Sequence, residues 1–195
     1  MCDGQSSNPP KHKCSFGLNN FLFPLRPSKG LLLTIAFSSI LVVGFYHKVV
    51  FHPNDYLFST QVDGLNNYYS FLYHIEHDRD YFHFGGMKYP YGEYVHYVDC
   101  HPGPANLLQF VNHHIIEISG YGVGLLNLGM LLSIVFCAMF LYLVLKHYGI
   151  NGLSGALGAT AISALSSQVL LWEHGHYALS YAFFFPMSWY LAIRW

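Results

Sequence analysis

The sequence predicts an all-α membrane protein with four transmembrane helices and a long outer loop that carries short amphipathic helices. Of its 195 residues, 53% are hydrophobic and only 10% are charged, whereas an ordinary soluble domain has about 25% charged residues. The mean hydropathy is +0.30. The 9 basic and 10 acidic residues leave a net charge of -1, which argues against nucleic acid as a partner and leaves membrane lipid as the expected surrounding.

Charge-free windows place the spanning helices. Four stretches contain no Asp, Glu, Lys or Arg: 30–47, 118–145, 147–172 and 174–193. A spanning helix needs roughly 20 apolar residues. We therefore expect transmembrane helices at 30–46, 118–145, 153–172 and 177–193.

The first apolar stretch could instead be a cleaved signal peptide, since it follows basic residues. A cleavage site requires small residues, but Gly44 is followed by the bulky Phe45 and Tyr46. An uncleaved anchor is favoured, with residues 1–29 as a cytoplasmic tail and 30–195 as a transmembrane bundle that includes the outer loop 47–117.

The distribution of charge orients the helices. One side of the predicted bundle carries one acid, Asp3, and six basic residues: Lys11, Lys13, Arg26, Lys29, Lys146 and Arg194. The other side carries nine acids and three basic residues. Basic residues near helix ends favour the cytoplasm. We expect a multi-pass protein of the cell membrane with its N-terminus inside and the 47–117 loop outside.

The expected third helix is rich in small residues. Gly155, Ala159 and Ser163 recur at every fourth position, and Ala156 and Thr160 form a parallel row. Small residues at this spacing let helix backbones approach closely in lipid. The pattern predicts a helix packed among others.

The outer loop divides into three parts. Residues 63–77 place apolar side chains at helical spacing, which predicts an amphipathic helix lying on the membrane surface. Residues 84–99 contain Gly85-Gly86 and Pro90, which are turn signals of a structured loop. Residues 101–112 begin with prolines suited to a helix start, and predict a second short helix.

Asp63 stands at the start of the first of these helices, and two interpretations of it remain open. Asp is a preferred N-cap, because its carboxylate accepts backbone N–H groups of the first turn. A carboxylate held at the membrane face can also act as a general base.

The histidines of the outer segments raise the possibility of a divalent metal. His74, His77, Asp78, Asp80 and His83 cluster in the sequence, and neutral imidazole is a common metal ligand. No established spacing such as HExxH is present. Interface and hydrogen-bonding roles are the alternative, so no cofactor is assigned.

Several motifs carry a resemblance to a known family. They are Val62–Tyr68, Lys88–Glu93, Asp99–Pro102 and Glu173–Leu179 with the later Pro186. Together with the order of tail, span, long outer loop and bundle, they resemble the GT-C superfamily of membrane glycosyltransferases, whose donors are polyprenyl-phosphate-linked sugars. The later loop is similar to that of uncharacterised bacterial multi-pass relatives. The resemblance covers about residues 30–195.

The resemblance implies a role for each candidate residue. Asp63 takes the position of the catalytic Asp of the first outer loop and would deprotonate the acceptor hydroxyl. Asp99, Glu173 and His176 would tune it or bind sugar and phosphate, and Arg79 and Lys88 would pair with the phosphate. The family has many more spans, so the chain is expected to be the N-terminal portion of a transferase.

A second function class fits the same features. A non-catalytic multi-pass protein, such as a transporter subunit or scaffold, could use the outer loop to bind a partner. The acidic side chains would then be solvated on the protein surface, and the tyrosines would form a belt at the membrane–water interface. Convergence of Asp63, Asp99 and Glu173 on one cavity would favour the enzyme.

Overall fold

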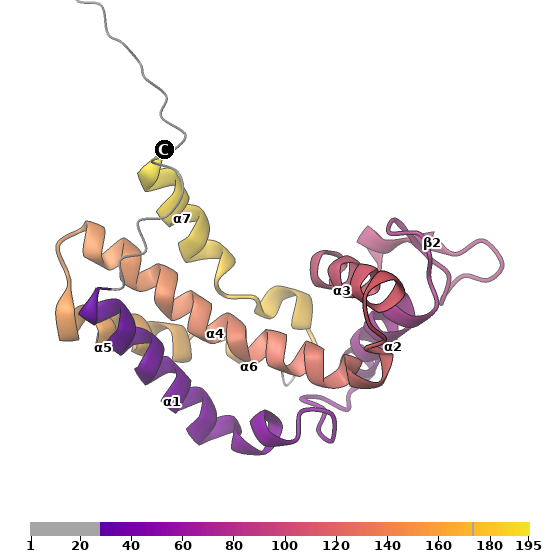
Figure 1. Ribbon diagram of the computed structural model, residues 1–195, viewed down its shortest axis with the longest axis horizontal. Coiled ribbons are helices and arrows are strands. Elements are labelled where there is room, and N and C mark those ends of the chain that lie inside the picture. The colour runs from indigo at the N-terminus through magenta and orange to yellow at the C-terminus, as the bar shows by residue number, and fades with distance from the viewer. Residues whose placement is uncertain (1–27, 173) are drawn as a thin grey trace, which may run out of the picture.

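A computed structural model describes residues 28–172 and 174–195, and Figure 1 shows it to be mostly helical. The elements in chain order are α1 (Lys29–Phe51), α2 (Val62–Glu76), β1 (His83–Phe84), β2 (Glu93–Tyr94), η2 (Val95–Tyr97), α3 (Pro102–His114), η3 (Ser119–Tyr121), α4 (Gly122–His147), α5 (Gly152–Ala164), α6 (Ser167–Leu170), η4 (Tyr177–Ser180) and α7 (Phe184–Arg194). Most of the expected cytoplasmic tail lies outside the described residues.

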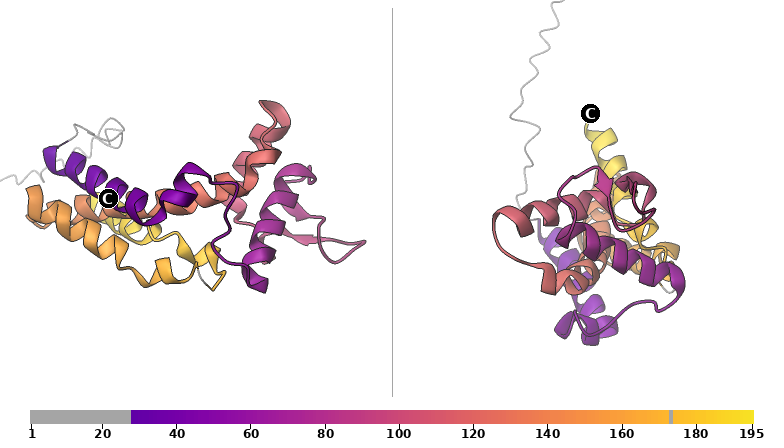
Figure 2. Two further views of the ribbon diagram at one scale, coloured as in Figure 1. Left: turned by 90° about the horizontal axis from the view of Figure 1, so that it is seen from below. Right: turned by 90° about the vertical axis from the view of Figure 1, so that its right-hand side faces the viewer.

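Within residues 28–172 and 174–195, three helical segments are long and apolar enough to cross a membrane. They are α1, the η3–α4 segment Ser119–His147, and the α5–α6 segment Gly152–Leu170. The helix α4 lies in the middle and packs against α1, α5 and α7 (Figures 1 and 2). Membrane association is therefore supported for three of the four expected spans.

The fourth expected span is not confirmed. Residues 177–193 form the short helix η4 and then α7, which has 11 residues. At 1.5 Å per residue α7 is only about 16 Å long. Pro186 explains the late start of α7. Proline lacks the N–H that a helix interior needs but is tolerated in the first turn, so the helix begins at Phe184.

The small-residue rows of α5 pack as expected. Gly155, Ala156, Ala159, Thr160 and Ser163 are its buried residues, and α5 contacts both α1 and α4. The three helices meet around the buried ring of Tyr142 from α4, beside Leu31 and Ala159. A Cβ atom added at Gly30 would overlap the Tyr142 hydroxyl.

Gly30→Leu is expected to destabilise the bundle by about 1–3 kcal/mol, the usual cost of forcing a side chain into a packed site. The reason is the close approach of α1 to the Tyr142 ring. Thermal unfolding of the detergent-solubilised protein measures the change.

Gly44→Leu is the matched control, because a Cβ atom at this α1 position meets nothing within 4 Å. It should leave the midpoint of unfolding near the wild-type value. Equal midpoints for the two variants would show that α1 and α4 do not pack as described.

The outer layer consists of α2, α3 and a small hairpin, at the right of Figure 1. The expected amphipathic helix 63–77 and the expected second helix 101–112 are confirmed as α2 and α3. The expected structured loop contains the antiparallel pair β1–β2, with His83 opposite Tyr94 and Phe84 opposite Glu93. Phe84 is fully buried in a core of its own, with Val95, Val98 and Cys100.

Polar side chains join the outer layer to the bundle. The Tyr68 hydroxyl of α2 donates to Asn127 Oδ1 of α4. The Asn127 amide donates in turn to the carbonyl oxygens of Pro53 and Tyr56, at 2.7 Å each. These contacts hold the N-terminal half of α2 against the end of α4 that faces the outer layer.

Candidate functional site

Asp63 is an exposed carboxylate in the first turn of α2. Gln61 occupies the N-cap, so the interpretation of Asp63 as the capping residue is wrong: the chain turns into the helix one residue before Asp63. Among the described residues its carboxylate has no hydrogen-bond or ion-pair partner. The positive end of the helix dipole favours an anion at this position. Asp63 is therefore available to a ligand.

The loop that follows α6 docks directly on the start of α2. Gly175 adopts φ +81°, and a Cβ atom there would overlap the Gly64 nitrogen and lie 3.0 Å from the Asp63 carbonyl carbon. The Asn67 amide donates to the Asp63 carbonyl at 2.7 Å and to the Gly175 carbonyl at 2.9 Å. Two segments more than one hundred residues apart are thus clamped together beside Asp63.

These contacts of Asn67 with the carbonyls of Asp63 and Gly175, which we call the clamp, bring together some of the expected site residues. His176 is exposed and follows Gly175, so Asp63 and His176 lie on segments in direct contact. Glu173 lies outside the described residues. Asp99 is exposed two residues before His101, and His101 contacts Asn67. Asp99 is therefore two residues along the chain from His101, whose side chain contacts Asn67 of the clamp.

Arg79 and Lys88 are not brought to Asp63. Arg79 lies beyond the far end of α2, and the thirteen steps along the helix from Asp63 to Glu76 span about 20 Å. Lys88 is in the hairpin, where it forms an ion pair with Glu93. Arg79 is therefore not placed to share a phosphate with Asp63, and Lys88 is already paired with an acid of its own hairpin.

His101 extends the clamp toward the bundle and was not singled out as a site residue by the sequence. The carbonyls of Asp63 and Gly175 take both hydrogens of the Asn67 amide. The Asn67 Oδ1 atom must therefore accept from His101 Nε2, 3.2 Å away. This tautomer leaves Nδ1 as an acceptor, and Nδ1 is buried without a partner.

Burial lowers the pKa of His101 to about 4, because the low-dielectric interior disfavours the charged imidazolium. The side chain is only 3% exposed. His101 is thus a neutral imidazole at physiological pH, and its Nδ1 atom offers a lone pair.

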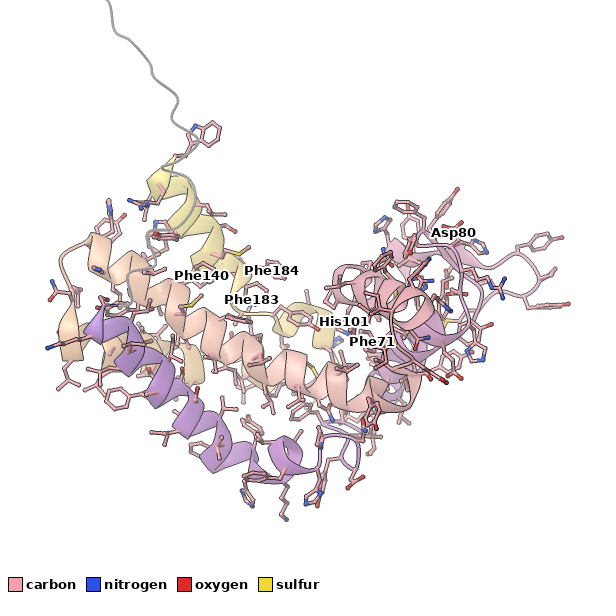
Figure 3. The ribbon with its side chains drawn as sticks, in the orientation of Figure 1. Phe71, Asp80, His101, Phe140, Phe183 and Phe184 are labelled. Atoms are coloured by element: carbon pink, nitrogen blue, oxygen red, sulfur yellow. The ribbon has the colours of Figure 1, made fainter. Side chains whose placement is uncertain are left out.

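An apolar groove of about 400 Å³ borders His101. It lies between the start of α3, the α4 helix and the segment from η4 to α7, where Figure 3 labels His101, Phe71, Phe183 and Phe184. Tyr181 is the other polar side chain of the wall, and its ring meets that of His101 edge-on at 5.5 Å.

The histidine–acid cluster is a structural network in the described part of the chain. His74 Nδ1 lies 2.8 Å from Asp78 Oδ2, and His74 Nε2 lies 2.8 Å from Asn106 Oδ1. Asp78 also accepts from the Gly85 N–H and, through its carbonyl, from Gln109. Across 28–172 and 174–195, no three His, Cys, Asp or Glu side chains group as metal ligands.

A second cavity lies on the hairpin, away from the clamp. Its volume is about 570 Å³, and it is lined by Asp80, Phe82, the Lys88–Glu93 ion pair and several tyrosines. Three of these rings are largely exposed: Tyr91 at 85%, Tyr97 at 81% and Tyr94 at 64%. Exposed aromatic clusters of this kind mark interaction surfaces.

Comparison with known proteins adds no relative. No family model, curated protein or solved structure matches this chain.

Proposed function

We propose that the protein is a GT-C type membrane glycosyltransferase that transfers a sugar from a polyprenyl-phosphate donor on the extracytoplasmic face, with Asp63 as general base. One observation carries the proposal: an unpartnered, exposed carboxylate stands on a helix end that is clamped to a loop 108 residues away in the chain. Such rigid support of an otherwise unused acid is what a catalytic group requires.

The reaction assigns one step to Asp63. Its carboxylate takes the proton of the acceptor hydroxyl as the oxygen attacks the anomeric carbon of the sugar. The bond from that carbon to the phosphate oxygen breaks, and the polyprenyl phosphate leaves with the electron pair. His176, Asp99 and Glu173 remain proposed partners for sugar hydroxyls. Arg79 and Lys88 are not assigned to the phosphate, because of their positions.

The proposed orientation follows from charge. The N-terminus and Lys146 lie in the cytoplasm and the 52–118 segment lies outside, with α7 entering the bilayer as part of a fourth span. This arrangement places Asp63 and the 174–176 loop on the same, outer face.

Sidedness of the donor tests the proposed function. Sealed right-side-out vesicles that contain the full-length protein should consume a polyprenyl-phosphate sugar supplied to the outer leaflet. The same donor restricted to the inner leaflet should remain intact. Consumption only from the inner leaflet would contradict an outer-face site.

Cysteine labelling tests the orientation separately. Tyr89, 93% exposed at the hairpin tip, and His147 at the end of α4 are each replaced by Cys in a chain whose Cys2 and Cys14 are Ser. A membrane-impermeant maleimide added outside intact cells should label the Cys at 89 and should label the Cys at 147 only after lysis.

The remaining cysteines, Cys100 and Cys137, are buried, so the chain without the new cysteines is the control and should stay unlabelled. Labelling of positions 89 and 147 from the same side of a sealed membrane would rule out the proposed orientation.

The exposed hairpin tyrosines favour a second candidate function, a partner-binding outer loop on a non-catalytic transporter subunit or scaffold. Tyr91 and Tyr97 are among the most exposed rings, and tyrosine supplies contact area at low entropic cost. Replacing both by Ser should remove the cellular function of a scaffold, whereas Asp63→Asn should leave that function intact.

A further inference from the structure

A cavity of about 330 Å³ at the end of α3 carries an unpaired positive charge. It is lined by Arg79, Tyr81, Gln109, His113 and His114, none of which is an acid. Arg79 is exposed, and within residues 28–172 and 174–195 no ion pair or hydrogen bond engages its guanidinium. The carboxylate of the preceding Asp78 is already engaged by His74 and by the Gly85 N–H. The cavity therefore offers its charge to an anion.

The level of this cavity in the membrane follows from the segment that begins beside it. Asn112 of α3 accepts, through Oδ1, from the N–H groups of Ile118 and Ser119, at 2.8 Å and 3.1 Å. Ser119 begins a segment of 29 residues that is able to span a membrane; at 1.5 Å per residue its length is about 43 Å. The hydrocarbon core and both headgroup layers together measure about 40–45 Å. The last turn of α3 is thus hydrogen-bonded to a residue at the level of the lipid headgroups.

Apolar side chains next to the cavity fit the same level. The Phe110 ring stacks on the His114 ring, with their centroids 4.7 Å apart, and Phe110 is exposed. Ile115 and Ile116 follow His114 and are 69% and 62% exposed. Apolar side chains at the membrane surface are buried at the boundary between headgroups and acyl chains. A molecule that contacts both the cavity and these side chains has an anionic head and hydrocarbon chains.

We propose that this cavity binds the phosphate of an anionic phospholipid, with Arg79 as its cationic partner and with Phe110, Ile115 and Ile116 against the acyl-chain boundary. A guanidinium group matches two phosphate oxygens at once. A zwitterionic lipid would bring an ammonium group to a cavity that no acid lines. The inference does not rest on the proposed sugar transfer, because the lipid is a bilayer component rather than the donor.

Native mass spectrometry of the full-length protein, titrated with phosphatidylglycerol in detergent, tests the role of Arg79. Arg79→Gln should weaken phosphatidylglycerol binding at least about ten-fold, since the loss of charge-assisted hydrogen bonds has an effect of this size. Lys88→Gln is the matched control, because it removes the same charge from a side chain that pairs with Glu93 and does not line this cavity. It should bind the lipid as the wild type does. Equal affinities of the two variants would overturn the proposal.

Competition against labelled phosphatidylglycerol tests the class of ligand on the wild-type protein. Glycerol 3-phosphate lacks the chains, diacylglycerol lacks the phosphate, and phosphatidylcholine lacks the net charge. Each should compete at least about five-fold more weakly than unlabelled phosphatidylglycerol. Equal competition by glycerol 3-phosphate would show a site for a free phosphate, and equal competition by diacylglycerol would show an apolar contact only. Equal competition by phosphatidylcholine would contradict the preference for an anionic head.

A fluorescent probe tests the membrane level independently of lipid affinity. Ile115→Cys, in a chain whose Cys2 and Cys14 are Ser, is labelled with an environment-sensitive dye in phosphatidylglycerol vesicles. Lipids that carry a nitroxide at the headgroup should quench this dye strongly. Tyr97→Cys is the control, because Tyr97 is also largely exposed but lines the hairpin cavity, and its dye should be quenched little. Equal, weak quenching at both positions would place the end of α3 outside the headgroup layer and overturn the proposal.

Discussion

Asp63→Asn is expected to lower the rate of sugar transfer by about 10²–10⁴-fold, the usual contribution of a general base. The Asn side chain has nearly the shape of Asp but cannot take a proton from the acceptor hydroxyl. The exposed Asp63 carboxylate has no partner among the described residues, so its neutralisation breaks no contact. Initial rates with a polyprenyl-phosphate sugar measure the loss of transfer. The thermal midpoint checks that the stability of the protein is unchanged.

Asp80→Asn is the matched control for this change. Asp80 is also an exposed acid of the outer layer, but it lines the hairpin cavity. It should transfer at close to the wild-type rate. Full activity in Asp63→Asn, with the protein folded, would remove Asp63 from the mechanism.

Gly175→Ala is expected to separate the 174–176 loop from α2 and to reduce transfer by about 10²-fold, as small displacements of a catalytic group do. Two costs combine. The left-handed backbone at φ +81° strains any residue with a Cβ atom by about 1 kcal/mol. The new methyl group would also overlap the backbone of Gly64, which cannot move without unwinding the first turn of α2.

Gly149→Ala isolates the first of these costs. Gly149 has φ +88°, and a Cβ atom there meets nothing within 4 Å. Its substitution should destabilise the protein by about 1 kcal/mol and leave transfer unchanged, whereas Gly175→Ala should cost a further 1–3 kcal/mol or so from overlap. Equal behaviour of the two variants would show that the loop is not docked on α2.

The fold was predictable where the signal is local. The apolar spacing of residues 63–77 predicts α2 because the buried face of an amphipathic helix has apolar residues that recur with a period of 3.6 residues. The end of the chain shows the limit of hydropathy. Residues 177–193 contain no charged residue, but Pro186 confines the helix to Phe184 and beyond. The length of a charge-free stretch alone does not predict where the helix within it begins.

The site was predictable only in part. The motifs Val62–Tyr68 and Glu173–Leu179 contain Asp63 and the 174–176 loop, and the structure holds these two segments together. The roles of Asn67 and His101 could not be predicted, because their contacts join positions 34 residues apart and follow no periodicity. The resemblance implied that Arg79 and Lys88 pair with a phosphate, but the length of α2 carries Arg79 away from Asp63.

The most direct measurement follows a radiolabelled sugar on its polyprenyl-phosphate carrier in vesicles that contain the purified full-length protein. The proposed function predicts protein-dependent loss of label from the lipid, with one polyprenyl phosphate formed for each sugar transferred to an added hydroxyl acceptor. Label that stays on the carrier over a range of donor sugars and acceptors, in vesicles whose protein is folded and correctly oriented, would contradict it.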